Sequence, residues 1–504
     1  MKGFVVIVCL TVVVLSAGSV FADTQIQKSD SPPSSLELTR PDPSGANTGG
    51  IKDTVGATPG APTVEDIKRL ATNEPLAVKL ADVVGRNKIA INIVWSLLCA
   101  FLVFFMQAGF AMVETGFTRA KNAGHTMAMN MMVLVFGVLG YWMCGYALQM
   151  GSKGFFLSGA VYDASIITLF LPHVVSMNIS ATIPTGAMAE RWTFKSFMVY
   201  GFFIAMFIYP LYAHWVWGGG WLAQLGRNFG LGHGVLDFAG SSVIHMLGGV
   251  SALAGAIVLG PRMGKFKTDG NPNAIPGHHV PMAIIGCLIL FFGWFGLTSG
   301  STLAAGDLRI GVIAVNTMLA SVAASFSAMC YMWFFYGKPD LSLSANGLLS
   351  GLVAITAPCA FVSPMGAVII GLVAGMLCCA SVFFVERTLK VDDPVGAVSV
   401  HGTCGAWGLI ALGLFADGTY GDGLNNVAGA VKGLFYGDAS QFVAEIIGVV
   451  VNFVFVFVVM YAFFKTLDKM IPLRVSEEVE FEGLDQSEVA VTAYPDFGIT
   501  KARR

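Results

Sequence analysis

Residues 90–113 read AINIVWSLLCAFLVFFMQAGFAMV, an apolar stretch without a single Asp, Glu, Lys or Arg. A helix of about 20 apolar residues is long enough to cross a bilayer, so this stretch predicts a membrane-spanning helix. The composition of the whole chain agrees, because 55% of its 504 residues are hydrophobic and only 12% are charged. An ordinary soluble domain carries about 25% charged residues. We therefore expect a membrane protein rather than a set of soluble domains.

Ten more apolar stretches follow the first one along the chain. Together with it, they lie at about 90–113, 126–150, 164–189, 196–218, 241–260, 280–304, 310–336, 344–362, 364–385, 397–415 and 441–464. Each is long enough to cross a bilayer at about 1.5 Å of rise per residue. The pattern predicts an all-α membrane protein with eleven transmembrane helices.

The first residues have the pattern of an exported protein. Lys2 precedes an apolar run over residues 4–15, and the residues that follow it, most of them small, end at Ala22. This order of charge, apolar run and small residues predicts a secretory signal peptide over residues 1–22. An uncleaved membrane anchor is the alternative.

Residues 23–89 are expected to form an extracytoplasmic leader. Its first part is rich in Pro, Gly, Ser and Thr without an apolar period, which is typical of a disordered segment. Further on, Thr63 and Asp66 are spaced as a capping box for a short amphipathic helix that runs towards Val84. The predicted division of the chain is therefore a signal peptide at 1–22, a leader at 23–89, a transmembrane domain at 90–467 and a C-terminal tail at 468–504.

Basic residues gather in alternate loops. If the N-terminus lies outside, the cytoplasmic loops hold Arg119, Lys121, Arg191, Lys195, Arg262, Lys265, Lys267, Lys338, Arg387 and Lys390. The opposite loops hold only Lys153, Arg227, Arg309 and Lys432. By the positive-inside rule, an odd number of spans then places the tail in the cytoplasm. The net charge of -2 leaves no basic patch for nucleic acid.

Four histidines lie inside predicted spans, where an ionisable group is costly unless it is neutral or partnered; they are His173, His214, His245 and His401. A hydrogen-bonded packing role is the simplest interpretation of a lone histidine. His245 and His401 differ, because Asp237 and Asp393 lie eight positions ahead of them, before the fifth and tenth spans. A five-span repeat reverses its orientation between copies. The spacing therefore predicts a 5+5 inverted-topology repeat plus a final helix.

The two repeat-related histidines are expected to meet near the middle of the membrane. Glycines follow each ring, in His245-Met-Leu-Gly-Gly and His401-Gly-Thr-Cys-Gly, and permit close backbone contact. Two neutral imidazoles that share one hydrogen bond offer a donor at one end and an acceptor at the other. That suits a small polar solute or a proton in a narrow apolar pore. A metal site is the alternative, but no third ligand is clearly placed beside the pair.

Several short segments are individually weak signals, but their order and spacing together are highly specific. They are Glu114-Thr-Gly-Phe-Thr-Arg-Ala-Lys-Asn122, Thr182-Ile-Pro-Thr-Gly-Ala-Met-Ala-Glu-Arg191, His214-Trp-Val-Trp-Gly-Gly-Gly220, Leu236-Asp-Phe-Ala-Gly240, Gly293-Trp-Phe-Gly296, Asp392-Asp-Pro394, His401-Gly-Thr-Cys-Gly405 and Phe481-Glu-Gly-Leu-Asp485. Through them the chain resembles the ammonium transporter (Amt/Rh) family, of the bacterial Amt type, over Ala90 to about Phe497.

This resemblance implies a homotrimer with one pore in each subunit, embedded in the lipid of a bacterial inner membrane. It also implies regulation by a PII-type protein at the cytoplasmic tail, and it makes His245 and His401 the twin pore histidines. It further implies that Trp217 and Ser301 recruit ammonium outside, with Asp237 as structural support. An indole face attracts a cation by about 0.5–2 kcal/mol, and a hydroxyl can accept an N–H bond. A place in the interfacial aromatic belt is the alternative for Trp217.

The expected function is ammonium transport rather than catalysis, and it needs no cofactor or metal. An ammonium ion would lose its hydration in about 30 Å of apolar pore, whereas ammonia is neutral and passes readily. The economical mechanism recruits the ion outside, removes its proton and conducts ammonia past the two histidines. Potassium has no proton to give and is rejected.

Two departures from the family concern the entrance of the pore. The family usually places stacked phenylalanines there, and the corresponding positions of this chain hold Ser176 and Leu297. We assign both residues to the recruitment site and expect a transporter with a wider entrance. Gly396 also stands where an Asp is common. The alternative function is an ammonium-binding sensor or a poorly conducting homologue.

Overall fold

The computed structural model describes residues 61–151, 154–159 and 162–495. The predicted signal peptide lies outside these residues. The chain divides near Arg86 into two compact units. The described part of the first unit is 61–86, and the second unit contains the described residues from Asn87 onward.

A capping box starts helix α2 (Val64–Asn73) in the first unit. The Asp66 N–H donates to Thr63 Oγ1 over 3.1 Å, and the Thr63 N–H donates to Asp66 Oδ2 over 3.1 Å. These bonds confirm the predicted start of the helix. The helix is shorter than predicted because Pro75, which has no N–H to donate, begins the next helix, α3 (Pro75–Phe117).

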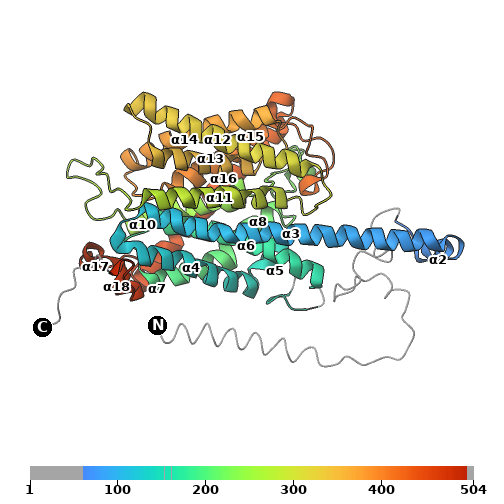
Figure 1. The fold of residues 1–504 in the computed structure, drawn as a ribbon, viewed down its shortest axis with the longest axis horizontal. Helices are drawn as coiled ribbons and strands as arrows, with labels where there is room; N and C mark the ends of the chain where they lie inside the picture. Colours follow the sequence, from blue (N-terminus) through green and yellow to red (C-terminus); the bar gives the residue numbers. More distant parts are fainter. Residues whose placement is uncertain (1–60, 152–153, 160–161, 496–504) are drawn as a thin grey trace. The chain divides into compact units, whose positions relative to one another are not determined.

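Ten helical segments of the described residues are long and apolar enough to cross a membrane (Figure 1). They are α3; α4 (Ala123–Gly140) with the π-helical turn η4 (Tyr141–Gly145) and α5 (Tyr146–Met150); α6 (Ala164–Ala187); α7 (Phe194–Phe203) with η5 (Ile204–Ile208) and α8 (Tyr209–Val216); η6 (Ser241–Met246) with α10 (Leu247–Leu259); α11 (Val280–Gly300); α12 (Arg309–Tyr336); α14 (Pro364–Arg387); η7 (Val398–Thr403) with α15 (Cys404–Phe415); and α16 (Ala439–Met470). Shorter elements are η3 (Ala120–Asn122), α9 (Leu225–Phe229), η8 (Leu424–Asn426) and η9 (Leu434–Tyr436). The prediction of an all-α membrane protein is confirmed.

The remaining predicted span, at 344–362, corresponds to α13 (Leu341–Thr356), a shorter apolar helix. At about 1.5 Å per residue its 16 residues rise about 24 Å, less than the roughly 30 Å of a bilayer core. Glycines let α13 pack closely on α12, because a Cβ on Gly351 would collide with the backbone carbonyl of Ala320. Ten spans are thus long enough, and the eleventh stays a prediction.

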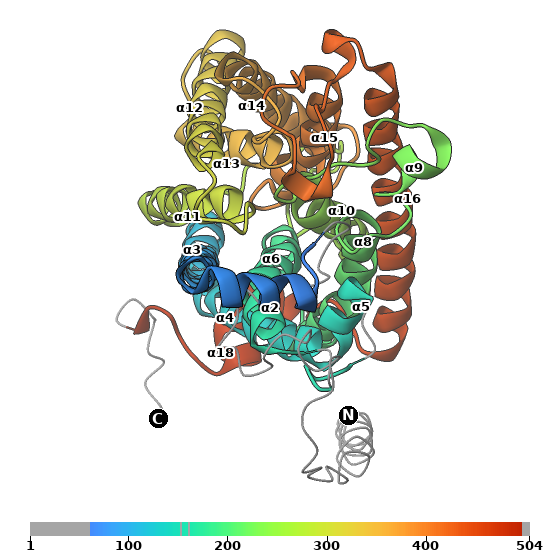
Figure 2. The same ribbon diagram turned by 90° about the vertical axis from the view of Figure 1, so that its right-hand side faces the viewer.

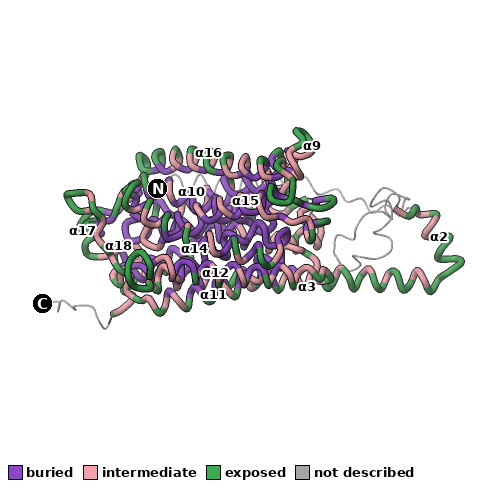
Figure 3. The backbone as a smooth tube through the Cα atoms, turned by 90° about the horizontal axis from the view of Figure 1, so that it is seen from above, coloured by how far each residue is buried: buried purple, intermediate pink, exposed green. Residues whose placement is uncertain are grey.

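The spans that begin with η6 and η7 lie in the interior of the second unit. In an apolar stretch of 18 residues within each span, buried residues make up 83% for Ser241–Leu259 and 67% for Val398–Phe415, but only 28% for α16. Figure 2 shows α10 towards the middle of the helices and α16 at their rim, and Figure 3 shows the buried residues concentrated inside. Side chains on these two central spans therefore face protein rather than lipid.

The same local structure precedes both central spans. Asp237 accepts a hydrogen bond of 2.9 Å from the N–H of Gly240 and further bonds from the first N–H groups of η6. Asp393 accepts a bond of 3.1 Å from the N–H of Gly396 and another from the first N–H of η7. Gly240 and Gly396 have φ values of 116° and 80°, which glycine adopts without strain. The two spans that the Asp–His spacing relates therefore begin with the same local backbone structure, and the five-span inverted repeat stays a prediction.

A C-terminal segment with α17 (Glu477–Glu482) and α18 (Leu484–Val489) covers one end of the helices (Figure 1). Asp485 accepts a hydrogen bond of 2.8 Å from the N–H of His125, at the start of α4. Glu480 accepts a bond of 2.7 Å from the N–H of Met263, in the loop after α10. The tail and these loops thus share one end, which agrees with the predicted grouping of the basic loops.

Buried ion pairs join the loops at this end. Glu190 pairs with Arg119 and, over 2.6 Å, with Arg262, which also pairs with Asp392 over 2.9 Å. Burial alone would raise the pKa of Asp392, but Arg191 and Arg262 outweigh that effect and hold this pKa well below its ordinary value. Because the charges come from separate loops, the network fixes the ends of the spans relative to one another.

Candidate functional site

Two imidazole rings meet in the interior of the second unit. His245 on η6 and His401 on η7 place their Nδ1 atoms 3.2 Å apart, and their ring planes are inclined by only 18°. Both side chains are buried. A contact of this length between two Nδ1 atoms requires a proton on one of them and a lone pair on the other. The pair therefore holds one proton between the rings and directs its two Nε2 atoms away from the contact.

Glycines allow the two π-helical turns to approach. A Cβ on Gly249 would collide with the backbone of Gly402. A Cβ on Gly405 would lie 2.6 Å from the carbonyl oxygen of Ser241 and 2.8 Å from the backbone nitrogen of Met246, which follows His245. Only residues without a side chain permit this distance between the two backbones.

Aromatic rings flank the pair. Trp294 stacks on His245 with ring centroids 4.8 Å apart and planes inclined by 12°. The Trp294 Nε1–H donates to Thr356 Oγ1 over 2.9 Å, which fixes the indole plane. On the other side, the ring of Phe110 lies 6.0 Å from that of His401. Sequence analysis did not predict that Trp294 or Phe110 contacts the histidine pair. An aromatic residue in an apolar span gives no signal that it faces a pore.

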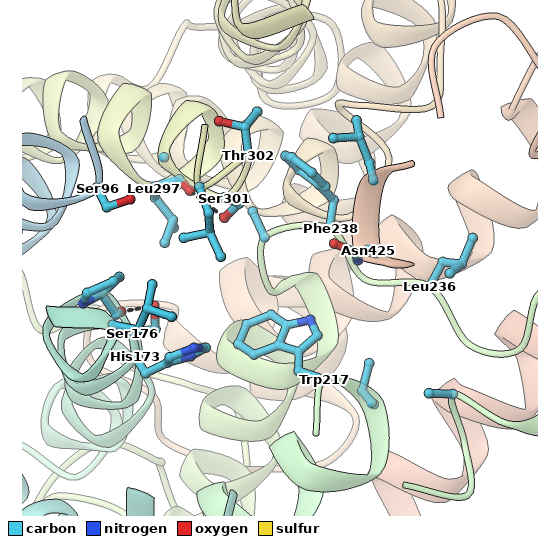
Figure 4. A pocket seen from close by; sticks show the side chains of 18 of the residues that line it. Ser96, His173, Ser176, Trp217, Leu236, Phe238, Leu297, Ser301, Thr302 and Asn425 are labelled. Atoms are coloured by element: carbon cyan, nitrogen blue, oxygen red, sulfur yellow. Dashed lines mark hydrogen bonds between the residues drawn. The ribbon is translucent and has the colours of Figure 1, made fainter. Parts of the chain in front are cut away.

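A cavity of about 650 Å³ is lined by the four residues that the family resemblance assigned to ammonium recruitment. Trp217, Ser301, Ser176 and Leu297 all line it, and Figure 4 shows Trp217 across the space from Leu297 and Ser301. Asp237 is absent from the lining. It supports the cavity indirectly, because its backbone carbonyl accepts the Trp217 Nε1–H over 2.6 Å while its carboxylate holds the start of η6.

The polar groups of this cavity retain free acceptor capacity. Ser301 Oγ donates its proton to the Leu297 carbonyl over 2.8 Å, and Ser176 Oγ donates to the Pro172 carbonyl over 2.8 Å. Each hydroxyl oxygen then has lone pairs for a donor in the cavity. Since the Trp217 N–H is occupied, its ring face is the part that can interact with a cation.

The two other histidines that the sequence placed inside spans, His173 and His214, both contact Gln149. His173 lines the same cavity, and its Nδ1 lies 3.1 Å from the Gln149 Nε2. His214 Nδ1 lies 2.9 Å from the Gln149 carbonyl oxygen. His214 therefore has a packing role, whereas the ring of His173 is directed towards the cavity near Trp217 (Figure 4).

Most of the described chain is similar in sequence to one known protein family. Residues 94–494 match the model of the family described as Ammonium Transporter Family. The ammonium transporter Amt2 of Archaeoglobus fulgidus is 47% identical over 424 residues, which cover 82% of this chain and 90% of that protein. The ammonium transporter of Bacillus subtilis is 35% identical over 418 residues, which cover 80% of this chain and 98% of that protein.

Solved structures have the same fold. A protein described as Sensor Amt Protein superposes with a TM-score of 0.73 and 35% identity, covering 80% of this chain and 99% of that one. Mep2 of Candida albicans superposes with a TM-score of 0.68 and 25% identity, covering 77% of this chain and 87% of that one.

Proposed function

Because this chain belongs to the ammonium transporter family and transports ammonium across a membrane, we propose that the large cavity recruits the ion and that ammonia then passes the His245–His401 pair. The observation that carries this proposal is the 3.2 Å contact between two buried imidazoles. Two neutral rings offer polar contacts without a fixed charge, which suits a neutral solute better than an ion.

Recruitment begins at the ring face of Trp217. An indole face attracts a cation by about 0.5–2 kcal/mol, more when the site is desolvated. The hydroxyl oxygens of Ser301 and Ser176 accept N–H bonds from the ion, because their own protons are given to backbone carbonyls. Leu297 adds apolar surface at the position where a second ring would stand. The cavity thus replaces part of the hydration shell of ammonium.

Loss of the proton decides which ions cross. Carrying a charge through about 30 Å of apolar protein costs far more than these contacts return. Ammonium can leave its proton behind and continue as ammonia, whereas potassium cannot. Trp294 stacks on His245 and covers one face of its imidazole, and the cavity beside His401 has a volume of only about 20 Å³. A space of this size accommodates ammonia but not a hydrated ion.

The absence of the family's two gate phenylalanines at positions 176 and 297 is compatible with transport. Ser176 and Leu297 line an open cavity of about 650 Å³, and neither of them is part of the histidine pair. The relatives named above are ammonium transporters. One solved structure of the same fold is described as Sensor Amt Protein, but the family model and both relatives named above describe ammonium transporters, so transport is the function that these observations support best.

We further propose the setting in which the protein works. The N-terminus lies outside a bacterial inner membrane after removal of the signal peptide at 1–22, and the tail lies in the cytoplasm. Three copies form a homotrimer, and the end covered by α17 and α18 is the surface that a PII-type protein reads. The shared position of the tail and the basic loops supports this orientation.

Flux through the purified protein tests the function. Liposomes that contain the wild-type protein are expected to take up methylammonium and to give ammonium-evoked currents, whereas potassium evokes none. Empty liposomes serve as the control. Bound ammonium without any flux would overturn transport in favour of a sensor.

A further inference from the structure

We infer that Glu114 is the proton carrier on the far side of the histidine pair, the residue that returns a proton to ammonia before it leaves the pore. Glu114 lies on α3, near its end at Phe117, and its side chain is buried. The inference rests on the proposed function, since it assigns the second half of the same proton transfer.

A small cavity joins Glu114 to the pair. It has a volume of about 20 Å³ and is lined by both Glu114 and His401, with Asn346 as the other polar residue among apolar neighbours. A cavity needs about 10–15 Å³ to hold one water molecule, so this one holds a single water or ammonia. A molecule there has the imidazole on one side and the carboxyl group on the other.

The partners of Glu114 fit both of its protonation states. Thr185 Oγ1 lies 2.7 Å from Glu114 Oε2 and 2.5 Å from the Thr182 carbonyl oxygen. A hydroxyl has one proton, so it donates to only one of these acceptors at a time. An ionised Glu114 takes that proton. A protonated Glu114 donates to Thr185 Oγ1, and the hydroxyl turns to the carbonyl of Thr182. One rotating hydroxyl therefore accommodates gain and loss of the proton.

Nothing in the described chain neutralises Glu114 as an anion. The ion pairs of the described residues do not include it, and its other partners are neutral groups: the amide of Asn130, whose Nδ2 donates over 2.6 Å, and the backbone N–H of Gly186. A carboxylate without a cation is costly inside a membrane. The carboxyl group is therefore protonated at rest, and the proton is available to a base that arrives in the cavity.

The transfer balances without another reactant. Ammonia in the small cavity takes the proton of Glu114: the O–H bond breaks, an N–H bond forms, and the products are ammonium and a carboxylate. The histidine pair carries the proton that ammonium lost in the large cavity. After the ammonium has left, a water molecule in the small cavity relays the proton: it gives a proton to the Glu114 carboxylate, which re-forms the O–H bond, and takes one from the imidazolium N–H of His401, which returns the pair to its neutral state. Each cycle thus moves one ammonia and one proton.

Two substitutions separate proton transfer from shape. Glu114→Gln keeps the size and the hydrogen-bond acceptor but cannot carry a proton. Glu114→Asp has a shorter side chain but can carry a proton. Currents evoked by ammonium are measured on liposomes of wild type and variants at equal protein content. We expect Glu114→Gln to lower the current about a hundredfold or more, the lower end of what an acid–base group contributes, and Glu114→Asp to retain more current than Glu114→Gln. Glu445→Gln makes the same change at another buried carboxylate that lines neither cavity, and it is expected to conduct as wild type.

A structural role predicts the reverse order, since Gln preserves the packing that Asp disturbs. A larger current in Glu114→Gln than in Glu114→Asp, or a wild-type current in Glu114→Gln, would overturn the inference while leaving transport intact. Wild-type uptake without current would do the same, because no proton would then cross. A wild type without any flux would refute the proposed function itself. If neither Glu114 variant folds, Thr185→Val, which lacks the rotating hydroxyl, must lower the current relative to Thr185→Ser; equal currents would refute the carrier.

Discussion

Gly405→Ala is expected to stop transport by separating the two imidazoles, although the residue touches neither ring. The Cβ of an alanine here would lie 2.6 Å from the Ser241 carbonyl oxygen, and ordinary contact begins at 3.4 Å, so the backbones must part by 0.8 Å. The Nδ1 atoms of His245 and His401 are 3.2 Å apart. If half of this 0.8 Å shift reaches the rings, their separation rises from 3.2 Å to 3.6 Å, beyond the length of a hydrogen bond.

The same shift has a cost in stability. Adding a methyl group to a packed interior destabilises a protein by about 1–3 kcal/mol, whereas alanine in place of glycine in an open helix stabilises it by up to about 1 kcal/mol. Gly311→Ala provides the matched control, because Gly311 lies on α12 with no atom within 4 Å of the added Cβ. Thermal unfolding in detergent and ammonium-evoked current in liposomes are measured for both variants.

We expect Gly405→Ala to melt at a lower temperature than wild type and to lose most of its current, and Gly311→Ala to do neither. Loss of stability with full current would show that the spacing of the rings is not critical. Wild-type stability and wild-type current together would refute the claim that glycine is needed for the approach of η6 and α15.

Three further substitutions test other parts of the account. Trp217→Leu is expected to weaken ammonium binding by about 2- to 30-fold, the equivalent of a cation–π contact, with little change in maximal flux. If the concentration dependence of the flux is unchanged, Trp217 is an interfacial belt residue instead of a recruitment residue. Combined Ser176→Phe and Leu297→Phe are expected to tighten apparent binding by a similar factor and to lower maximal flux, and unaltered flux kinetics would show that these positions do not form the entrance. Asp392→Asn removes one of the two carboxylates that pair with the buried Arg262 and leaves Glu190 as the other, and we expect thermal unfolding to show a loss of up to about 3–5 kcal/mol. Because the pKa of Asp392 is held low, wild type keeps this contribution above the ordinary Asp pKa of about 3.9 and loses it only as the pH falls through the lower folded value; a loss of stability near pH 6 would contradict this assignment.

The membrane-spanning fold could be predicted because its signal is spread over many residues. Long apolar stretches give the spans, and the Asp–His spacing indicates the repeat. The length of α13 could not be predicted, since the apolar composition continues past Thr356 into the turn before α14. Helix ends inside an apolar segment depend on tertiary contacts, and here the N–H of Ala357, just beyond the helix, donates to Ser241 Oγ of η6 over 2.7 Å.

The site was predictable only where its residues are polar in apolar surroundings. His245 and His401 are polar residues inside apolar stretches, and the structure brings them into contact. Glu114 is also a polar residue beside an apolar stretch, but it lies next to the end of the predicted first span and is therefore easily assigned to a loop. The structure extends α3 to Phe117 and buries this carboxyl group. Trp294 has no such signal, because only the fold shows which face of α11 meets the pair.

The ratio of ammonium to potassium conductance in His401→Ala tests the central claim most directly. Wild-type liposomes are expected to pass ammonium-evoked current and no potassium current. Without the second ring the variant lacks the hydrogen-bonded pair, and a potassium current is expected to appear beside the ammonium current, while thermal unfolding shows that the helices remain assembled. A folded variant with the wild-type ratio and the wild-type ammonium current would contradict the account.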